Sequence, residues 1–289
     1  MRTIKSSKKA SLKVKNRMEQ IVKSNKELPK ELIFVVAHPN HFPEKGFELA
    51  RILSQAHDKE IAFLGLLTGQ SPEAATYETK FKEWSNTNQE QVDKRIEYVV
   101  IHEEELSDFI EENEGGVLIF EQCQEKPFNK PKTLLKMCRE LRIPYYIIQS
   151  NHKIEINRVL VPVGFLVEEK EKGIFCSGMG RFLKAEILLM PANDYGSRAR
   201  NNTESIKTLL EKFGINHQIV EAKKDSFKVE IEAAKKANEL NADMILISSS
   251  RDYGIDDILF GPKELMVIKK SPVPVMIINP RKDLYTLCG

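Results

Sequence analysis

The sequence has no hydrophobic run long enough to cross a membrane and no cysteine spacing typical of a metal site. No apolar stretch among its 289 residues reaches the roughly 18 residues of a transmembrane helix. Residues 1–30 are basic and lack the apolar core of a signal peptide. The four cysteines show no CxxC pattern, which favours reduced thiols over disulfides or zinc ligands. We therefore expect a cytoplasmic protein without membrane insertion and without a bound metal.

Positive charge is concentrated at the start of the chain. Residues 1–31 hold ten Lys and Arg against three Glu, whereas the whole chain has a net charge of only +2. We interpret residues 1–30 as a basic N-terminal extension. Four apolar residues of this extension recur at helical spacing, so part of it could form a helix that packs on the protein, on a partner subunit or on an anionic surface. These residues are Val14, Met18, Ile21 and Val22. The extension has no aromatic side chain to stack on bases, and the rest of the chain is not basic, so nucleic acid is not an expected partner.

The second half of the chain repeats the first at low resolution. Three apolar runs of the first half each have a counterpart about 126 to 130 residues later. The pairs are 31–40 with 157–166, 116–123 with 243–250, and 142–151 with 271–280. Because about 130 residues is an ordinary domain length, this offset predicts two copies of one domain. We place the domains at residues 31–152 and 153–289.

Each half alternates short apolar runs with helical patterns. Predicted strands are 32–37, 61–67, 97–101, 117–121, 144–149, then 158–163, 185–190, 217–220, 244–247 and 273–278. Predicted helices are 44–57, 78–95, 103–112, 130–141, then 168–183, 203–213, 229–240 and 256–269. This alternation predicts an α/β fold with two tandem, doubly wound, five-stranded parallel-sheet domains. Ligands of such sheets bind at the carboxyl ends of the strands.

The fifth strand of each half begins at prolines, which cannot donate a hydrogen bond to a neighbouring strand. Pro144 lies at the start of one, and Pro272 and Pro274 lie at the start of or within the other. Exposed edges rich in Val, Ile and Tyr favour pairing with another strand. We therefore expect strands 144–149 and 273–278 to meet where the two repeats pack as a pseudo-dimer.

A polar loop follows the fourth strand of the second half. Its serine hydroxyls, its arginine, its glycines and the start of the next helix could together hold an anion, with Gly164 at the end of the first strand leaving space for it. These residues are Ser248, Ser249, Ser250, Arg251, Gly254 and Gly261. The alternative is an ordinary loop that caps the helix. The corresponding loop of the first half, residues 121–127, has no glycine and contains Glu121 and Glu125, which would repel a phosphate.

The order of these segments resembles the universal stress protein family. The features that carry the resemblance are the RVLVPV opening strand, the apolar fourth strand with its polar loop, and the SPVPVMII ending. The chain is similar to the tandem two-domain members over nearly everything from residue 31. The resemblance implies an adenine nucleotide alpha hydrolase-like fold and a place in stress physiology.

Members of this family that bind ATP carry a Gly-x-x-Gly-x9-Gly-Ser/Thr motif after the fourth strand. Here the first two glycines fall on Ser248 and Arg251, and the final Ser/Thr falls on Pro262. Gly261 matches the final glycine, and Gly254 matches a further glycine common inside the loop. The aspartate that ends the first strand in the family falls on Gly164 and on His38. The resemblance therefore implies a degenerate nucleotide or anion site with no resident cofactor.

One competing motif lies just after the first strand. Residues 38–41, His-Pro-Asn-His, are similar to the His-x-Gly-His signature of nucleotidylyl transferases, and residues 247–250 weakly resemble a second motif of those enzymes. Asn40 replaces the glycine, and the two motifs lie in different repeats. A polar turn is the plainer interpretation of His38 and His41.

The sequence thus predicts a non-catalytic regulatory protein of the universal stress type. We expect it to act through binding, with itself as one partner, through the pseudo-dimer and a possible homodimer, and with a protein partner of unknown identity. The alternative is a nucleotide-binding enzyme, either a weak ATPase or a nucleotidylyl transferase that uses His38 and His41.

Overall fold

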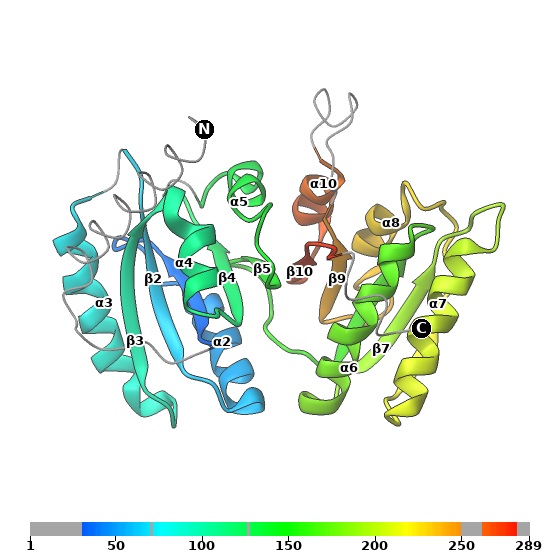
Figure 1. The fold of residues 1–289 in the computed structure, drawn as a ribbon, viewed down its shortest axis with the longest axis horizontal. Coiled ribbons are helices and arrows are strands. Elements are labelled where there is room, and N and C mark those ends of the chain that lie inside the picture. The colour runs from blue at the N-terminus through cyan, green and yellow to red at the C-terminus, as the bar shows by residue number, and fades with distance from the viewer. Residues whose placement is uncertain (1–30, 70–71, 126–127, 250–261, 282–289) are drawn as a thin grey trace, which may run out of the picture.

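The strands form one sheet in which two five-stranded halves meet edge to edge (Figure 1). The computed structural model describes residues 31–69, 72–125, 128–249 and 262–281. The strand order is β3-β2-β1-β4-β5-β10-β9-β6-β7-β8. Read outward from the centre, each half has the order fifth, fourth, first, second, third. The two halves are therefore related as a pseudo-two-fold pair, and the predicted fold class is confirmed.

The first half contributes five strands and four α-helices to the described structure. Its strands are β1 (Ile33–Ala37), β2 (Ile61–Leu67), β3 (Ile96–His102), β4 (Val117–Gln122) and β5 (Tyr145–Gln149). Its helices are α2 (Glu44–His57), α3 (Ala74–Asn88), α4 (Leu106–Glu112) and α5 (Pro131–Met137), with short 3₁₀ turns η1 (Gln89–Gln91) and η2 (Glu103–Glu105).

The second half follows the same order. Its strands are β6 (Arg158–Val163), β7 (Glu186–Pro191), β8 (His217–Ile219), β9 (Met244–Ser248) and β10 (Val275–Ile278). Its helices are α6 (Lys172–Phe182), α7 (Arg198–Lys212), α8 (Val229–Lys236) and α10 (Lys263–Lys270), with a 3₁₀ turn η3 (Val167–Glu171) before α6.

Helices cover both faces of the sheet, which explains why the central strands are apolar at every position rather than at alternate ones. One core packs α4, α5, α8 and α10 against one face. The other core packs α2, α3, α6 and α7 against the opposite face. All five residues of β1 and of β9 are buried. The sheet therefore holds the ends of these strands in fixed positions.

The two halves join through β5 and β10, as predicted. These strands pair antiparallel, with Tyr145 opposite Ile277 and Ile147 opposite Val275, whereas all other strand pairs of the sheet are parallel. The pairing satisfies two edges that would otherwise expose backbone N–H and C=O groups. Pro144 and Pro274 lie just before the two strands and interrupt neither ladder.

Several predicted bounds are wrong. Helix α7 begins at Arg198 rather than at residue 203, and helices α5 and α8 end at Met137 and Lys236, four residues before their predicted ends. Helix α3 spans residues 74–88 rather than 78–95, so the prediction placed both of its ends too late. The Gln89 side chain bonds the backbone of Lys94 and Ile96, which turns the chain into β3. In the second half, β6 pairs with β9 only at Val159 and Leu160, whereas β1 pairs with β4 over four residues.

None of the helices in the described parts of the chain is both long enough and apolar enough to cross a membrane.

Candidate functional site

The predicted anion site lies at the carboxyl ends of β6 and β9. Ser248 ends β9 and is 3% exposed, Ser249 follows it, and Gly164 follows β6. The structure does not describe Ser250, Arg251, Gly254 or Gly261, so their part in the site stays a prediction.

Side chains from three other segments surround the backbone of Gly164. Its N–H donates to Glu169 Oε2 at 2.9 Å, and its carbonyl accepts from Asn202 Nδ2 at 2.9 Å. A Cβ atom at this position would lie 3.3 Å from Ser226 Oγ. The Ser226 hydroxyl is itself held by the Asp194 carboxylate. The space expected beside Gly164 is therefore filled by Ser226 and Glu169.

Next to this glycine lies a chain of buried charges. Lys172, at the first position of α6, is fully buried, and its ammonium donates to Glu169 at 2.7 Å and to the Pro162 carbonyl at 2.6 Å. The same ammonium lies 3.8 Å from Glu230 Oε1, near the start of α8. Glu230 Oε2 in turn lies 3.1 Å from Lys263 Nζ, at the start of α10. Two carboxylates and two ammonium groups thus alternate across the strand ends, and we call them the charge chain.

The electrostatics of the charge chain favour its ionised form. Burial alone would raise the pKa of the Glu169 carboxyl, but Lys172 and Lys263 outweigh burial and hold that pKa below its ordinary value of 4.5. Burial likewise opposes the charge of Lys263, yet Glu230 and Glu169 raise the pKa of this lysine above its ordinary range. The two carboxylates of the charge chain neutralise its two ammonium groups, so the charge chain needs no external anion.

The two described serines differ in their partners. Ser249 donates through its backbone N–H to the Ile278 carbonyl and through its hydroxyl to Asn279 Oδ1 at 2.6 Å. Asn279 also donates to the carbonyls of Cys138 and Leu141 in the first half. Ser249 therefore belongs to the junction between the halves. The Ser248 hydroxyl is buried without a hydrogen-bond partner among the described residues.

The carboxyl ends of β1 and β4 form the corresponding region of the first half. Glu121, 3% exposed near the end of β4, accepts from the Gly46 N–H at the start of α2 at 2.9 Å. The other oxygen of this carboxylate lies 3.5 Å from His41 Nε2. A carboxylate at a helix N-terminus occupies the position that a bound phosphate would take. Glu121 therefore supplies this anion from within the chain.

His38 and His41 form a tight turn after β1. The His41 N–H donates to the His38 carbonyl at 2.9 Å, and His38 Nδ1 accepts from the Asn40 N–H at 3.3 Å. The His38 ring packs edge-on against Tyr77, with ring centroids 5.6 Å apart. Burial is the main cause that lowers the pKa of His38 below 6.5. Among the residues that the structure describes, no group of three or more His, Cys, Asp or Glu side chains could hold a metal ion.

The strand registers show which residues of the two halves correspond. Ile33 in β1 is opposite Val117 in β4, and Val159 in β6 is opposite Met244 in β9. Four residues further along β4 and β9, Glu121 corresponds to Ser248. The same internal position therefore carries a bonded carboxylate in one half and, in the other, a hydroxyl that has no partner within the part of the chain that the structure describes.

Sequence reasoning did not find the charge chain. Lys172 lies on the apolar face of α6 with Cys176 and Met179, at positions i, i+4 and i+7, and all three are buried. A lysine on an apolar stripe is the one signal that could have revealed it, because a buried lysine needs a charged partner. Its partner Glu230 is remote in sequence, and no local pattern connects the two.

Comparisons with known proteins support the fold. No family model and no curated protein matches the sequence. A universal stress protein from Archaeoglobus fulgidus is similar in structure with a TM-score of 0.62 at 16% identity, over 88% of this chain and 98% of that one. A putative universal stress protein from Pseudomonas aeruginosa has a TM-score of 0.61 at 13% identity, over 90% and 96% of the two chains. A protein of unknown function from the same species has the same TM-score and identity, over 90% and 95%.

These matches span almost the whole length of each protein, so they include both halves of the sheet. The chain therefore has the fold of universal stress proteins in its two-half form, as the sequence resemblance implied.

Proposed function

We propose that this protein is a non-catalytic regulatory protein of the universal stress type, whose nucleotide sites are degenerate in both halves. The observation that carries this proposal is that side chains of the protein already occupy both strand ends. Glu121 bonds the Gly46 N–H in the first half, and Glu169 bonds the Gly164 N–H in the second. A triphosphate would have to displace each carboxylate from the N–H group that it needs.

Displacement in the second half would also disrupt the charge chain. Moving Glu169 would leave Lys172, which is fully buried, with Glu230 at 3.8 Å as its nearest remaining carboxylate. Breaking a buried ion pair costs about 3–5 kcal/mol, which is comparable with the whole binding free energy of a millimolar ligand. We therefore expect ATP to bind with a Kd no tighter than about 1 mM.

The second half is the better candidate for any residual anion binding. The Ser248 hydroxyl, which none of the described residues bonds, supports this, since its counterpart Glu121 would repel an anion. We propose that a phosphate-like anion, if bound, contacts Ser248 and the predicted Arg251 of the adjoining loop.

The competing transferase hypothesis fits the geometry less well. Strand β1, which precedes His38, and strand β9, which precedes Ser249, are separated by β4, β5 and β10. Four spacings of about 4.8 Å place the two strand ends roughly 19 Å apart. One active site could not use both motifs, and Glu121 lies where the triphosphate would have to be held.

Calorimetric titration with Mg-ATP tests the proposal. We expect no measurable heat at micromolar protein and ATP, and no rise in melting temperature at 1 mM ATP. A Kd in the micromolar range, or steady release of phosphate or pyrophosphate, would overturn it.

A pair of substitutions tests which half retains anion binding. Arg251→Glu in the second half is expected to abolish any binding of a phosphate analogue, and Gln124→Glu in the first half is expected to leave it unchanged. The reverse result would assign the residual site to the first half.

We further propose that the protein functions in the cytoplasm, that residues 31–152 and 153–289 are its two domains, and that it acts through a protein partner or a homodimer. The apposed β5 and β10 support self-association within the chain. Light scattering coupled to size-exclusion chromatography gives the oligomeric state, and an affinity pull-down from stressed cells identifies the partner.

A further inference from the structure

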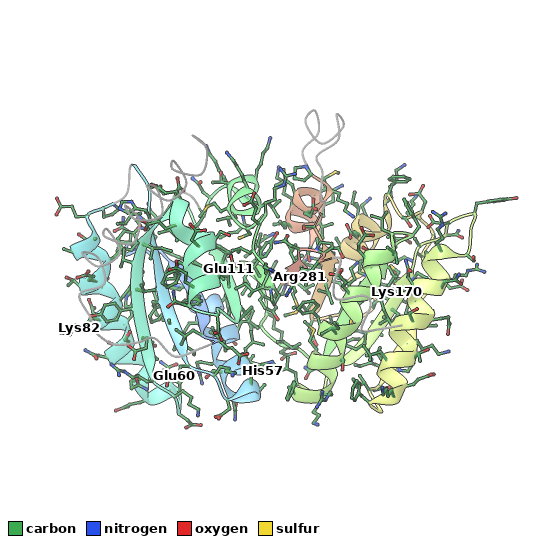
Figure 2. The ribbon with its side chains drawn as sticks, in the orientation of Figure 1. His57, Glu60, Lys82, Glu111, Lys170 and Arg281 are labelled. Atoms are coloured by element: carbon green, nitrogen blue, oxygen red, sulfur yellow. The ribbon has the colours of Figure 1, made fainter. Side chains whose placement is uncertain are left out.

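A cavity of about 260 Å³ lies between the two halves, near the amino ends of the strands. It is therefore at the opposite end of the sheet from the degenerate nucleotide sites. Helix α2 contributes Leu53 and His57, helix α6 contributes Gly178 and Met179, and strand β5 contributes Tyr146. His57, at the end of α2, marks this end of the molecule in Figure 2. The walls come mainly from apolar side chains of both halves.

Gly178 keeps this cavity open. Glycine inside a helix costs up to about 1 kcal/mol relative to alanine, so its presence needs a reason. The other two glycines of α6 have one in close packing: a Cβ on Gly180 would lie 2.2 Å from Ile215, and a Cβ on Gly173 would lie 3.3 Å from Leu209. A Cβ on Gly178 would meet no atom within 4 Å. Close packing therefore does not explain why position 178 is a glycine. The cavity beside it does, because a larger side chain at this position would fill it.

The Tyr146 side chain supplies a polar group to the cavity wall. Tyr146 is only 3% exposed and lines the cavity. Burial raises the pKa of this phenol well above its ordinary value of 10, so the group is neutral and able to donate or accept. A ligand that forms a hydrogen bond with this hydroxyl would gain about 1 kcal/mol net.

The charged groups at the cavity cancel one another. Lys59 forms an ion pair with Glu31, and both line the cavity. His57 packs on the Phe182 ring with centroids 4.9 Å apart, and burial, followed by the nearby Lys59, lowers the pKa of its imidazole below 6.5. The imidazole is therefore neutral at pH 7. A charged ligand would lose its hydration without gaining an unpaired counter-ion, which favours a neutral one.

We propose that this cavity binds a neutral, mostly apolar small molecule that carries one hydrogen-bonding group directed at Tyr146. The volume sets its size, because an apolar protein cavity of about 150 Å³ holds benzene. A cavity of 260 Å³ therefore accommodates roughly ten heavy atoms, the size of indole. Sites between two packed units are common places for such ligands. This binding activity is independent of the nucleotide sites at the other end of the sheet.

Three probes of similar shape test the chemistry by calorimetry on the full chain. Indole has a ring N–H, indene lacks it, and indole-3-carboxylate adds a charge. We expect saturable 1:1 binding of indole, binding of indene about fivefold weaker through loss of one hydrogen bond, and no binding of the carboxylate. Tyr146→Phe should weaken indole binding about fivefold and leave indene binding unchanged.

Substitution at Gly178 tests the location. Gly178→Leu should abolish the binding of both neutral probes, and Gly178→Ala, which only narrows the cavity and favours the helix, should weaken it. Gly196→Leu is the matched control, because a Cβ at Gly196 also meets no atom within 4 Å but lies outside the cavity. Thermal melts establish whether each variant is folded. If Gly178→Leu does not fold, the weaker binding expected of Gly178→Ala is the test of location.

Four results would overturn the proposal, and the first three concern the probes and the variants already named. They are failure of the wild-type chain to bind indole, unchanged binding after Gly178→Leu, and tighter binding of the carboxylate than of indole. The N-terminal extension enters the described structure at Glu31, which lines the cavity. If indole binds only after Val14 and Met18 are changed to serine, the extension is the occupant and the small-molecule proposal fails.

Discussion

Side chains of the protein fill the carboxyl ends of the strands in both halves, but the two halves use different residues. In the first half a single carboxylate, Glu121, bonds the start of α2. In the second half the corresponding residue is Ser248, and the charge chain of Glu169, Lys172, Glu230 and Lys263 fills the region instead. Glu121 connects one strand with one helix, whereas the charge chain connects η3, α6, α8 and α10.

This difference predicts unequal consequences of mutation. A carboxylate that caps one helix can be removed at the cost of one hydrogen bond and a local interaction with the helix dipole. A central lysine in a buried charge chain cannot be removed without leaving charges unpaired. Both halves should therefore bind nucleotide poorly, but the second half should depend far more on its polar groups for stability.

Loss of the central lysine should have the largest effect. Lys172→Met keeps the length of the side chain but leaves Glu169 without its bonded cation, and we expect a loss of about 3–5 kcal/mol in the free energy of unfolding. Urea denaturation followed by circular dichroism measures this loss. Lys170→Met, on the partly exposed turn before α6 and labelled in Figure 2, is the control and should change stability by less than about 0.5 kcal/mol. Equal effects of the two substitutions would contradict the importance of the charge chain.

Removal of the carboxylate in the first half should have a smaller effect. Glu121→Ala leaves the Gly46 N–H without an acceptor, at an expected cost of about 1–2 kcal/mol. Glu121→Gln keeps an acceptor and loses only the charge, so its cost should be about 0.5–1 kcal/mol. Gln124→Ala, on the exposed loop that follows, is the neutral control. A loss after Glu121→Ala as large as that after Lys172→Met would remove the contrast between the halves.

Acidification should affect the first half before the second. Because burial lowers the pKa of His38 in the folded state, the unfolded chain takes up this proton first, and stability is complete above about pH 6.5 and declines below it. The pKa of Glu169 is also lowered, so its contribution persists until the pH falls below about 4.5.

Urea denaturation at pH 7.5 and 5.5 measures the decline caused by His38 separately, because both pH values lie above the range in which Glu169 loses its contribution. His38→Asn should lose less stability than the wild type between these values, with part of the decline left because burial also lowers the pKa values of His57 and His152. An identical decline in both proteins would show that His38 does not contribute.

The smallest effect is expected at Ser248. Because its buried hydroxyl has no partner among the described residues, Ser248→Ala removes a desolvated polar group and should leave stability unchanged or raise it by up to about 1 kcal/mol. A loss of more than 1 kcal/mol would show that the hydroxyl is bonded, and would end the contrast with Glu121.

Most elements could be predicted because their signals are local. Helix 44–57 and strands 61–67 and 158–163 have the predicted bounds, since each coincides with a change in hydrophobic period. The pairing of β5 with β10 followed from apolar edge strands bordered by prolines. Helix α3 was misplaced because its end depends on the Gln89 side chain, whose partners are defined only after the turn has formed.

The sequence by itself determined the repeat, the strand and helix order, and the residue types that follow the fourth strand of each half. These properties follow from spacing and residue type along the chain. Only the tertiary structure decided which side chains meet at the strand ends, because Lys172 and Glu230 come together through the packing of α6 and α8 on opposite faces of the sheet. The same holds for the cavity beside Gly178, which exists because α2 and α6 belong to different halves and leave a gap where the halves join.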